Sequence, residues 1–147
     1  MSRIFITGSS AGLGLLAGRH LIGQGHEVVM HARTPEKARA LRTELPGAAE
    51  VLVADLESMA QTRALADSAN ALGRFDAVIH NAGVGDRGTD RLGPDGLPVV
   101  FAVNVLAPYL LTALMLRPAR LVYLGSSMHF GARPARPGSL WQDGRWR

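Results

Sequence analysis

A glycine-rich turn near the start of the chain has the make-up of an anion-binding loop. Its glycines are Gly8, Gly12 and Gly14, directly behind the apolar run 3–7 and ahead of an amphipathic stretch. A turn between a strand and a helix start presents backbone N–H groups and the helix dipole to a phosphate. Glycine is needed where a Cβ would block a pyrophosphate. The spacing differs from Gly-x-Gly-x-x-Gly and lacks the Gly-Lys-Ser/Thr ending of a Walker loop. We predict a phosphate cradle, with a ligand-free structural turn as the alternative.

Two charged residues stand where the next expected strands end. Arg33 lies just past the second strand, where a doubly wound fold presents a residue to the adenosine ribose. An arginine there suits the 2′-phosphate of NADP, whereas an acid would suit the 2′-hydroxyl of NAD. The sequence therefore favours NADP(H) over NAD(H), the alternative being a solvated arginine ahead of a helix. Asp55 follows the third strand, and on the sequence alone it could equally be an acid leading the helix that opens at Ser58.

Two further polar positions lie later in the chain. Asn104 sits inside an otherwise apolar helix, where a buried amide needs hydrogen-bond partners. It either serves a site or bends the helix near Pro108. Ser127 follows the fifth expected strand, at the carboxyl edge where open α/β sheets bind ligands.

Strand and helix patterns alternate along the chain. Strands are expected at 3–7, 27–31, 51–53, 77–79 and 121–124, and helices at 12–24, from Thr34-Pro35 to Pro46, from Ser58 through Leu72, and over 99–116. The inward faces expected for the first three helices are Leu13, Leu16, Ala17 and Leu21; Ala38, Leu41 and Leu45; and Leu65, Ala69 and Leu72. A long loop is expected over 84–98. Strands separated by helices form a parallel sheet with right-handed crossovers.

The fold prediction is a three-layer, Rossmann-like doubly wound α/β sheet of about five strands in the order 3-2-1-4-5. At 147 residues the chain suits one domain, residues 1–147, with an irregular tail over 128–147. We expect this domain to bind NAD(P).

Composition argues against several other classes of protein. The net charge is +4, but the basic residues are scattered, which argues against nucleic acid. There is no cysteine and the five histidines lack ligand spacing, so no metal is expected. The apolar run 99–116 contains Asn104 and Pro108 and lacks flanking anchors, so we expect no membrane span. The first strand begins within three residues of Met1 without a secretory pattern, and a cytoplasmic location is expected.

Four ordered motifs resemble the short-chain dehydrogenase/reductase family, and the tail resembles its retinol-dehydrogenase-like bacterial members. They are the Thr-Gly-x-x-x-Gly-x-Gly form of residues 7–14, the His-Asn-Ala-Gly of residues 80–83, the helix residue Asn104, and the strand leading to Ser127. The resemblance implies that Asp55, followed by Leu56, touches the adenine amino group. The cofactor contacts that it implies are Thr7, Gly8, Ser10, Gly12, Leu13, Gly14, Arg33, Asp55, Leu56, Asn81, Ala82 and Gly83.

The same resemblance implies a reaction, a reversible hydride transfer between NADPH and a small carbonyl or alcohol substrate. By position, Ser127 would bond the substrate oxygen, and Asn104 would hold a water of the proton relay. The family also uses a tyrosine followed four residues later by a lysine. Here the tyrosines are Tyr109 and Tyr123, and the only lysine is Lys37, so the pair is absent.

The resemblance covers nearly all of this chain but about the front half of a typical member. We therefore expect the C-terminal elements to be missing and the chain to be inactive alone. A non-catalytic NADP(H)-binding or regulatory module is one alternative, and a remnant that binds nothing is another. Loss of later elements would expose the helix 99–116, so a homo-oligomer through that helix is expected.

Overall fold

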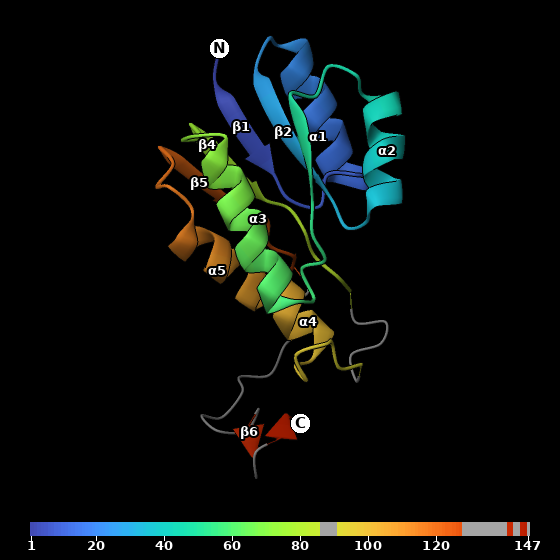
Figure 1. Cartoon of the computed structure of the whole chain (residues 1–147), viewed down its shortest axis with the longest axis vertical. Coiled ribbons are helices and arrows are strands. Elements are labelled where there is room, and N and C mark those ends of the chain that lie inside the picture. Colours follow the sequence, from blue (N-terminus) through green and yellow to red (C-terminus); the bar gives the residue numbers. More distant parts are fainter. Residues whose placement is uncertain (86–90, 128–140, 143–144, 147) are drawn as a thin grey trace.

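A five-stranded parallel sheet forms the centre of the molecule (Figure 1). The computed structural model describes residues 1–85, 91–127, 141–142 and 145–146. The strands are β1 (Arg3–Ile6), β2 (Glu27–Ala32), β3 (Glu50–Val53), β4 (Ala77–His80) and β5 (Arg120–Tyr123). Their order is β3-β2-β1-β4-β5, and every pair is parallel. The predicted sheet and its strand order are confirmed.

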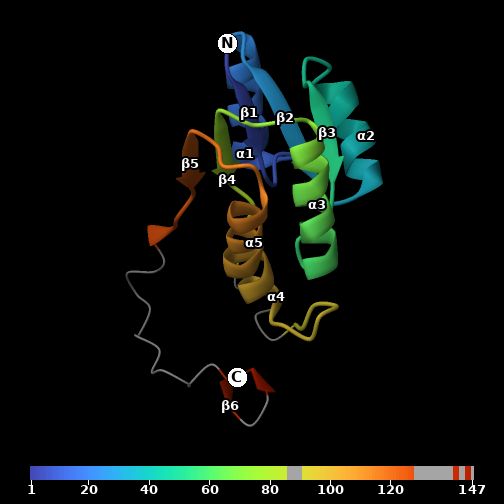
Figure 2. The ribbon, with the colours of Figure 1, turned by 60° about the vertical axis from the view of Figure 1, so that its left-hand side comes forward.

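Helices cover both faces of this sheet (Figure 2). They are α1 (Gly12–Gly23), α2 (Pro35–Glu44), α3 (Met59–Ala71), α4 (Val99–Phe101), the π-helical η1 (Ala102–Leu106) and α5 (Ala107–Leu114). Two buried clusters lie between the layers, one under α1 and α2 and one under α3 and α5. The three-layer arrangement is therefore confirmed.

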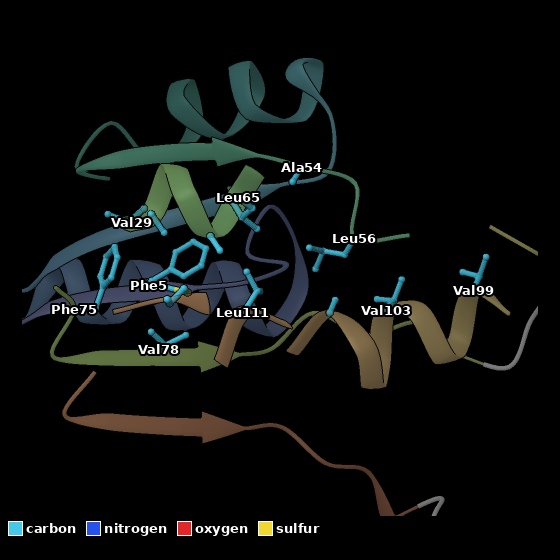
Figure 3. Close-up of a cluster of buried hydrophobic side chains, with 14 residues drawn as sticks. Phe5, Val29, Ala54, Leu56, Leu65, Phe75, Val78, Val99, Val103 and Leu111 are labelled. Carbon is cyan, nitrogen blue, oxygen red and sulfur yellow. The ribbon is translucent and has the colours of Figure 1, made fainter. Parts of the chain in front are cut away.

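Alternate residues of the central strand β1 pack into the two clusters. Ile4 and Ile6 belong to the cluster of α1 and α2, whereas Phe5 belongs to the opposite one. Figure 3 shows Phe5 beside Phe75, with ring centroids 5.6 Å apart. A strand covered on both faces has apolar side chains on both, which explains the three consecutive apolar residues Ile4, Phe5 and Ile6.

Two helix starts behave largely as their sequences predict. Thr34 Oγ1 accepts a hydrogen bond from the Lys37 amide at 3.3 Å, with Pro35 in the first turn. Ser58 Oγ accepts from the Gln61 amide at 3.4 Å. Gln61 Oε1, however, accepts from the Asp55 amide at 2.8 Å, so the glutamine fixes the residues after β3.

The predicted inward face of α1 is wrong in part. Leu13 and Leu16 are 71% and 58% exposed, whereas Gly14 and Gly18 are buried. A Cβ on Gly18 would lie 2.4 Å from Met30 Cε. The helix backbone packs directly on the sheet there, which turns the neighbouring leucines outward. Leu72, beyond the end of α3, is exposed as well.

The expected helix 99–116 is helical but not uniform. It is divided into α4, η1 and α5, and it ends at Leu114. Proline cannot donate to the carbonyl four residues earlier, so Pro108 interrupts the α-helical hydrogen bonds at Asn104. Asn104 itself is exposed rather than buried. No helix among residues 1–85 and 91–127 is long and apolar enough to cross a bilayer.

Most of the predicted tail, 128–140, 143–144 and 147, lies outside the described residues. Among the described residues of the tail, β6 (Trp141–Gln142) pairs antiparallel with β7 (Arg145–Trp146).

Candidate functional site

A cleft of about 380 Å³ lies at the carboxyl ends of β1 to β4. Nine of the twelve predicted cofactor-contact residues line it: Gly8, Ser10, Leu13, Arg33, Asp55, Leu56, Asn81, Ala82 and Gly83. Its other lining residues are Ala11, His31, Ala54, Glu57, Val84 and Val103. The predicted residues Thr7, Gly12 and Gly14 are not in this lining. The structure thus brings segments from four strand ends to one site.

The glycine turn is packed tightly against the segment after β4. Gly8 has φ +61°, and a Cβ there would lie 2.7 Å from Ala82 Cα. A Cβ on Gly14 would lie 2.5 Å from Asn81 Nδ2. Gly12 has φ +57° and open space around it. Glycine is therefore required for close approach at two positions and for backbone conformation at two.

Thr7 and Asn81 hold these two segments together from behind the cleft. The Asn81 side-chain amide donates to the carbonyl oxygens of Thr7 and Gly8 at 3.0 and 2.9 Å. Thr7 Oγ1 accepts from the amides of Asn81 and Ala82, both at 3.1 Å. Thr7 is buried, so it positions the cleft wall rather than facing the cleft.

His31 is a residue of the cleft that the sequence reasoning missed. Its Nδ1 accepts from the Gly8 amide at 2.9 Å, and its Nε2 lies 3.0 Å from the carbonyl oxygen of Ala54. Its backbone amide donates to Ser9 Oγ at 2.7 Å, and Ser9 is buried too. Burial lowers the pKa of His31 to about 4. The imidazole is therefore neutral at pH 7 and links β2 to the glycine turn and to the end of β3.

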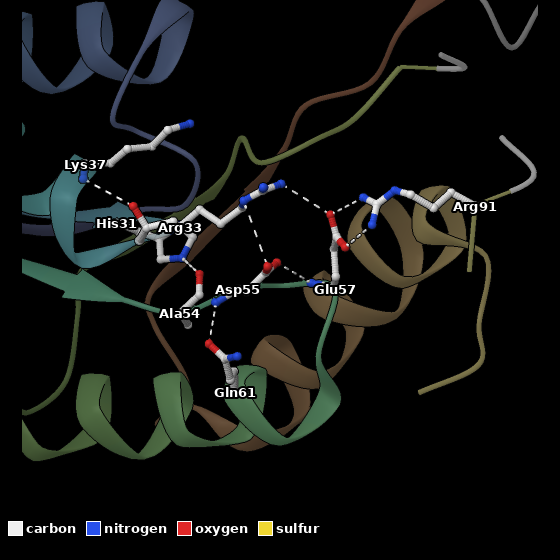
Figure 4. A network of polar contacts seen from close by, with 9 residues as sticks. His31, Arg33, Lys37, Ala54, Asp55, Glu57, Gln61 and Arg91 are labelled. Atoms are coloured by element: carbon white, nitrogen blue, oxygen red, sulfur yellow. Dashed lines mark hydrogen bonds and ion pairs between the residues drawn. The ribbon is translucent and has the colours of Figure 1, made fainter. Parts of the chain in front are cut away.

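Charged side chains gather at the β2 and β3 end of the cleft (Figure 4). Arg33 Nη1 lies 3.3 Å from Glu57 Oε1, and Arg33 Nε lies 3.9 Å from Asp55 Oδ2. Arg91 binds Glu57 through two hydrogen bonds of 2.5 and 2.8 Å. Hydrogen bonds from Arg91 lower the pKa of Glu57 below its ordinary value, so Glu57 is ionised at pH 7. The sequence reasoning missed both Glu57 and Arg91, because single charged residues in loops carry no pattern.

The two residues assigned to catalysis lie outside the cleft lining. Asn104 Oδ1 accepts from the Val84 amide at 2.8 Å, and its Nδ2 donates to the Val84 carbonyl at 2.9 Å. Asn104 thereby fixes a lining residue without lining the cleft itself. Ser127 is exposed beyond the end of β5.

His80, the first residue of the His-Asn-Ala-Gly motif, faces α5 rather than the cleft. Its Nε2 lies 3.2 Å from Thr112 Oγ1, and its ring stacks on Tyr123 with centroids 4.8 Å apart. Burial lowers the pKa of His80 to about 4. Within the described part of the chain, no three His, Cys, Asp or Glu side chains are placed to hold a metal ion.

A doubly wound parallel sheet with a cleft at its carboxyl edge defines the Rossmann-like class of α/β proteins. Within that class, a family profile described as short chain dehydrogenase matches residues 2–124. The chain belongs to the short-chain dehydrogenase family.

Individual relatives agree with this assignment. An uncharacterized oxidoreductase of Emericella nidulans is 53% identical over 134 residues, which cover 89% of this chain and 52% of the relative. The crystal structure of an uncharacterized Mycobacterium paratuberculosis protein is 29% identical with a TM-score of 0.82, covering 99% of this chain and 54% of the other. A metagenomic short-chain oxidoreductase in complex with NADP is 30% identical with a TM-score of 0.69, covering 91% and 64%. The chain spans about half the length of the curated relatives that it matches.

Proposed function

We propose that this chain is the NADP(H)-binding part of a short-chain oxidoreductase that transfers hydride to or from a carbonyl or alcohol carbon. The observation that carries the proposal is Arg33, which lines the same cleft as the glycine turn. An arginine at this place suits the 2′-phosphate of NADP. The NADP complex of the metagenomic relative gives independent support.

The cleft residues fit such a cofactor. Gly8 leaves no room for a Cβ, and Gly12 stands at the start of α1, where backbone amides face an anion. We propose that this turn receives the pyrophosphate and that Asp55 and Leu56 lie against the adenine. Asn81, Ala82 and Gly83 would form the wall beside the nicotinamide ribose. When bound, NADP(H) supplies the hydride donor or acceptor.

We propose Ser127 as a hydrogen-bond donor to the substrate oxygen and Asn104 as a positioning residue. The chain contains no Tyr-x-x-x-Lys pair, which the family uses as its proton donor. We therefore propose that this chain is inactive alone. A cytoplasmic location is part of the same proposal.

Calorimetric titration with NADPH and with NADH tests cofactor binding. NADPH is expected to bind more tightly, and Arg33→Gln to weaken NADPH roughly 10- to 100-fold while NADH changes less than twofold, because only the charged hydrogen bonds to the 2′-phosphate are lost. Arg39→Gln is the matched control, since Arg39 is an exposed arginine that pairs with Glu36 on α2. Equal loss for both cofactors would contradict the role of Arg33. NADPH oxidation with a panel of aldehydes and ketones tests inactivity, which clear turnover would disprove.

The missing Tyr-x-x-x-Lys pair also favours a second candidate, a non-catalytic NADP(H)-binding or regulatory module. The coding sequence downstream of this chain separates the two. A Tyr-x-x-x-Lys pair in any frame there supports the oxidoreductase, whereas unrelated sequence supports the module.

We also propose a homo-oligomer through the helix 99–116. Large apolar side chains are exposed on this stretch and on the side of β5 that contacts α5: Val105, Tyr109, Leu114, Leu116, Leu121 and Tyr123. Exposed large apolar side chains of this kind are typical of an interface.

A further inference from the structure

Glu57 is shared between two arginines at the β2 and β3 end of the cleft (Figure 4). Its Oε1 atom contacts both Arg33 Nη1 and Arg91 Nη2, at 3.3 and 2.5 Å, and its Oε2 contacts Arg91 Nη1 at 2.8 Å. The Glu57 side chain is 8% exposed, whereas those of Arg33 and Arg91 are 54% and 56% exposed. The carboxylate is therefore the fixed member, and the two guanidinium groups reach it from solvent.

A ligand phosphate would have to compete with carboxylates for Arg33. Arg33 faces Glu57 and also Asp55, so its single positive charge stands against two negative ones. Arg91 restores neutrality, since it binds Glu57 through both oxygens. Without Arg91, the buried carboxylate of Glu57 would bind Arg33 more strongly, because an unpaired buried charge is costly.

We propose that Glu57 determines how strongly this site prefers a 2′-phosphorylated adenine nucleotide over its unphosphorylated counterpart. Glu57 restrains Arg33 and so lowers the preference. Arg91 neutralises much of the charge of Glu57. The attraction of Glu57 for Arg33 is thereby weakened, which leaves Arg33 available to bind the phosphate. Arg91 acts through Glu57 and is a positioning residue, outside the lining of the cleft. This inference rests on the proposed binding of NADP(H).

The two residues are therefore expected to have opposite effects when removed. Glu57→Gln keeps the size of the side chain, removes the competing charge and raises the preference for the 2′-phosphate roughly fivefold, the size of a partly exposed ion pair. Arg91→Gln leaves Arg33 as the only arginine that pairs with Glu57 among the described contacts, and lowers the preference for the 2′-phosphate by a similar factor. In the Glu57→Gln background, Arg91→Gln has no further effect, because its route to Arg33 is gone.

Calorimetric titration of the full chain with adenosine 2′,5′-bisphosphate and with adenosine 5′-monophosphate measures the preference. The two probes differ by one phosphate, so damage to the fold lowers both affinities and leaves their ratio unchanged. Glu44→Gln is the matched control, since Glu44 pairs with Arg19 in an exposed ion pair remote in sequence from these loops. Arg91→Gln changes an exposed side chain, which keeps the test available where Glu57→Gln folds poorly.

Opposite shifts in the two single variants, with no effect of Arg91→Gln in the double variant, support the proposal. An unchanged ratio in both single variants overturns it. A ratio that Arg91→Gln lowers equally in both backgrounds overturns the indirect role, because Arg91 would then contact the phosphate itself. Failure of the unmodified chain to bind either probe overturns the proposed function as well, which distinguishes that failure from an unchanged ratio.

Discussion

His31 is expected to hold the glycine turn and the end of β3 together only while its ring is neutral. Because Nδ1 accepts from the Gly8 amide, the proton sits on Nε2, which donates to the Ala54 carbonyl. Protonation would place a second N–H against the Gly8 amide and break that hydrogen bond. Burial accordingly lowers the pKa of His31 from 6.5 to about 4.

The lowered pKa makes folding stability dependent on pH. Between pH 6.5 and about 4, the unfolded chain binds the proton and the folded chain does not, so stability falls as the pH falls through this window. At about 1.4 kcal/mol per pH unit, the loss amounts to roughly 3 kcal/mol. The pKa of His80 is lowered in the same direction, to about 4, so two histidines contribute.

Urea unfolding between pH 5 and 7.5 measures the effect. From the two histidines, the free energy of unfolding is expected to change by roughly 2–3 kcal/mol per pH unit between pH 5 and 6, and His31→Leu is expected to halve this slope. At pH 7.5 the same variant should lose roughly 2–5 kcal/mol, because Gly8 N–H and Ala54 C=O lose their partner. His20→Leu, which removes an exposed imidazole of α1, is the control. An undiminished slope in His31→Leu would refute the reasoning.

Two further changes test the packing of α1 and the exposed helix face. Gly14→Ala places a Cβ 2.5 Å from Asn81 Nδ2, so the free energy of unfolding should fall by about 3 kcal/mol and NADPH binding should be lost. Gly23→Ala, whose Cβ would meet nothing within 4 Å, should be neutral or slightly stabilising. Equal behaviour of the two variants in urea unfolding and titration would contradict this packing. Tyr109→Glu, on the exposed face of α5, should convert a dimer into a monomer in sedimentation equilibrium. A monomeric unmodified chain at high concentration would rule out the proposed interface.

Strand order and the place of the cleft can be predicted from local sequence patterns. The glycines of residues 8–14 and the apolar run of β1 are local patterns, and parallel strands joined by helices leave few topologies. Because carboxyl ends of parallel strands meet at one edge, Arg33, Asp55 and Asn81 could be assigned to one site without coordinates. The structure places all three in the lining of one cleft.

The rest depends on contacts between residues distant in the sequence. His31 has the spacing of an ordinary strand residue, and its importance arises because Gly8 and Ala54 are brought to its two nitrogens. Helical periodicity also misplaced the inner face of α1, since it favours Leu13 over a glycine. The close approach of α1 to the segments that follow β1 and β4 reverses that choice, because the helix buries Gly14 rather than a larger side chain.

The two ends of the cleft are held by different kinds of interaction, and changing the salt concentration distinguishes them. Neutral, partly buried hydrogen bonds of Thr7, Asn81 and His31 hold the glycine turn. Half-exposed ion pairs around Glu57 hold the β2 and β3 end. Salt screens exposed charges and leaves buried neutral bonds nearly unchanged. Salt also screens the attraction between the half-exposed Arg33 and the phosphate. Because that attraction exists only for the 2′-phosphorylated ligand, raising the salt concentration should reduce the preference for a 2′-phosphate while the chain keeps its stability at pH 7.5. A parallel loss of both would show that the ion pairs support the whole cleft.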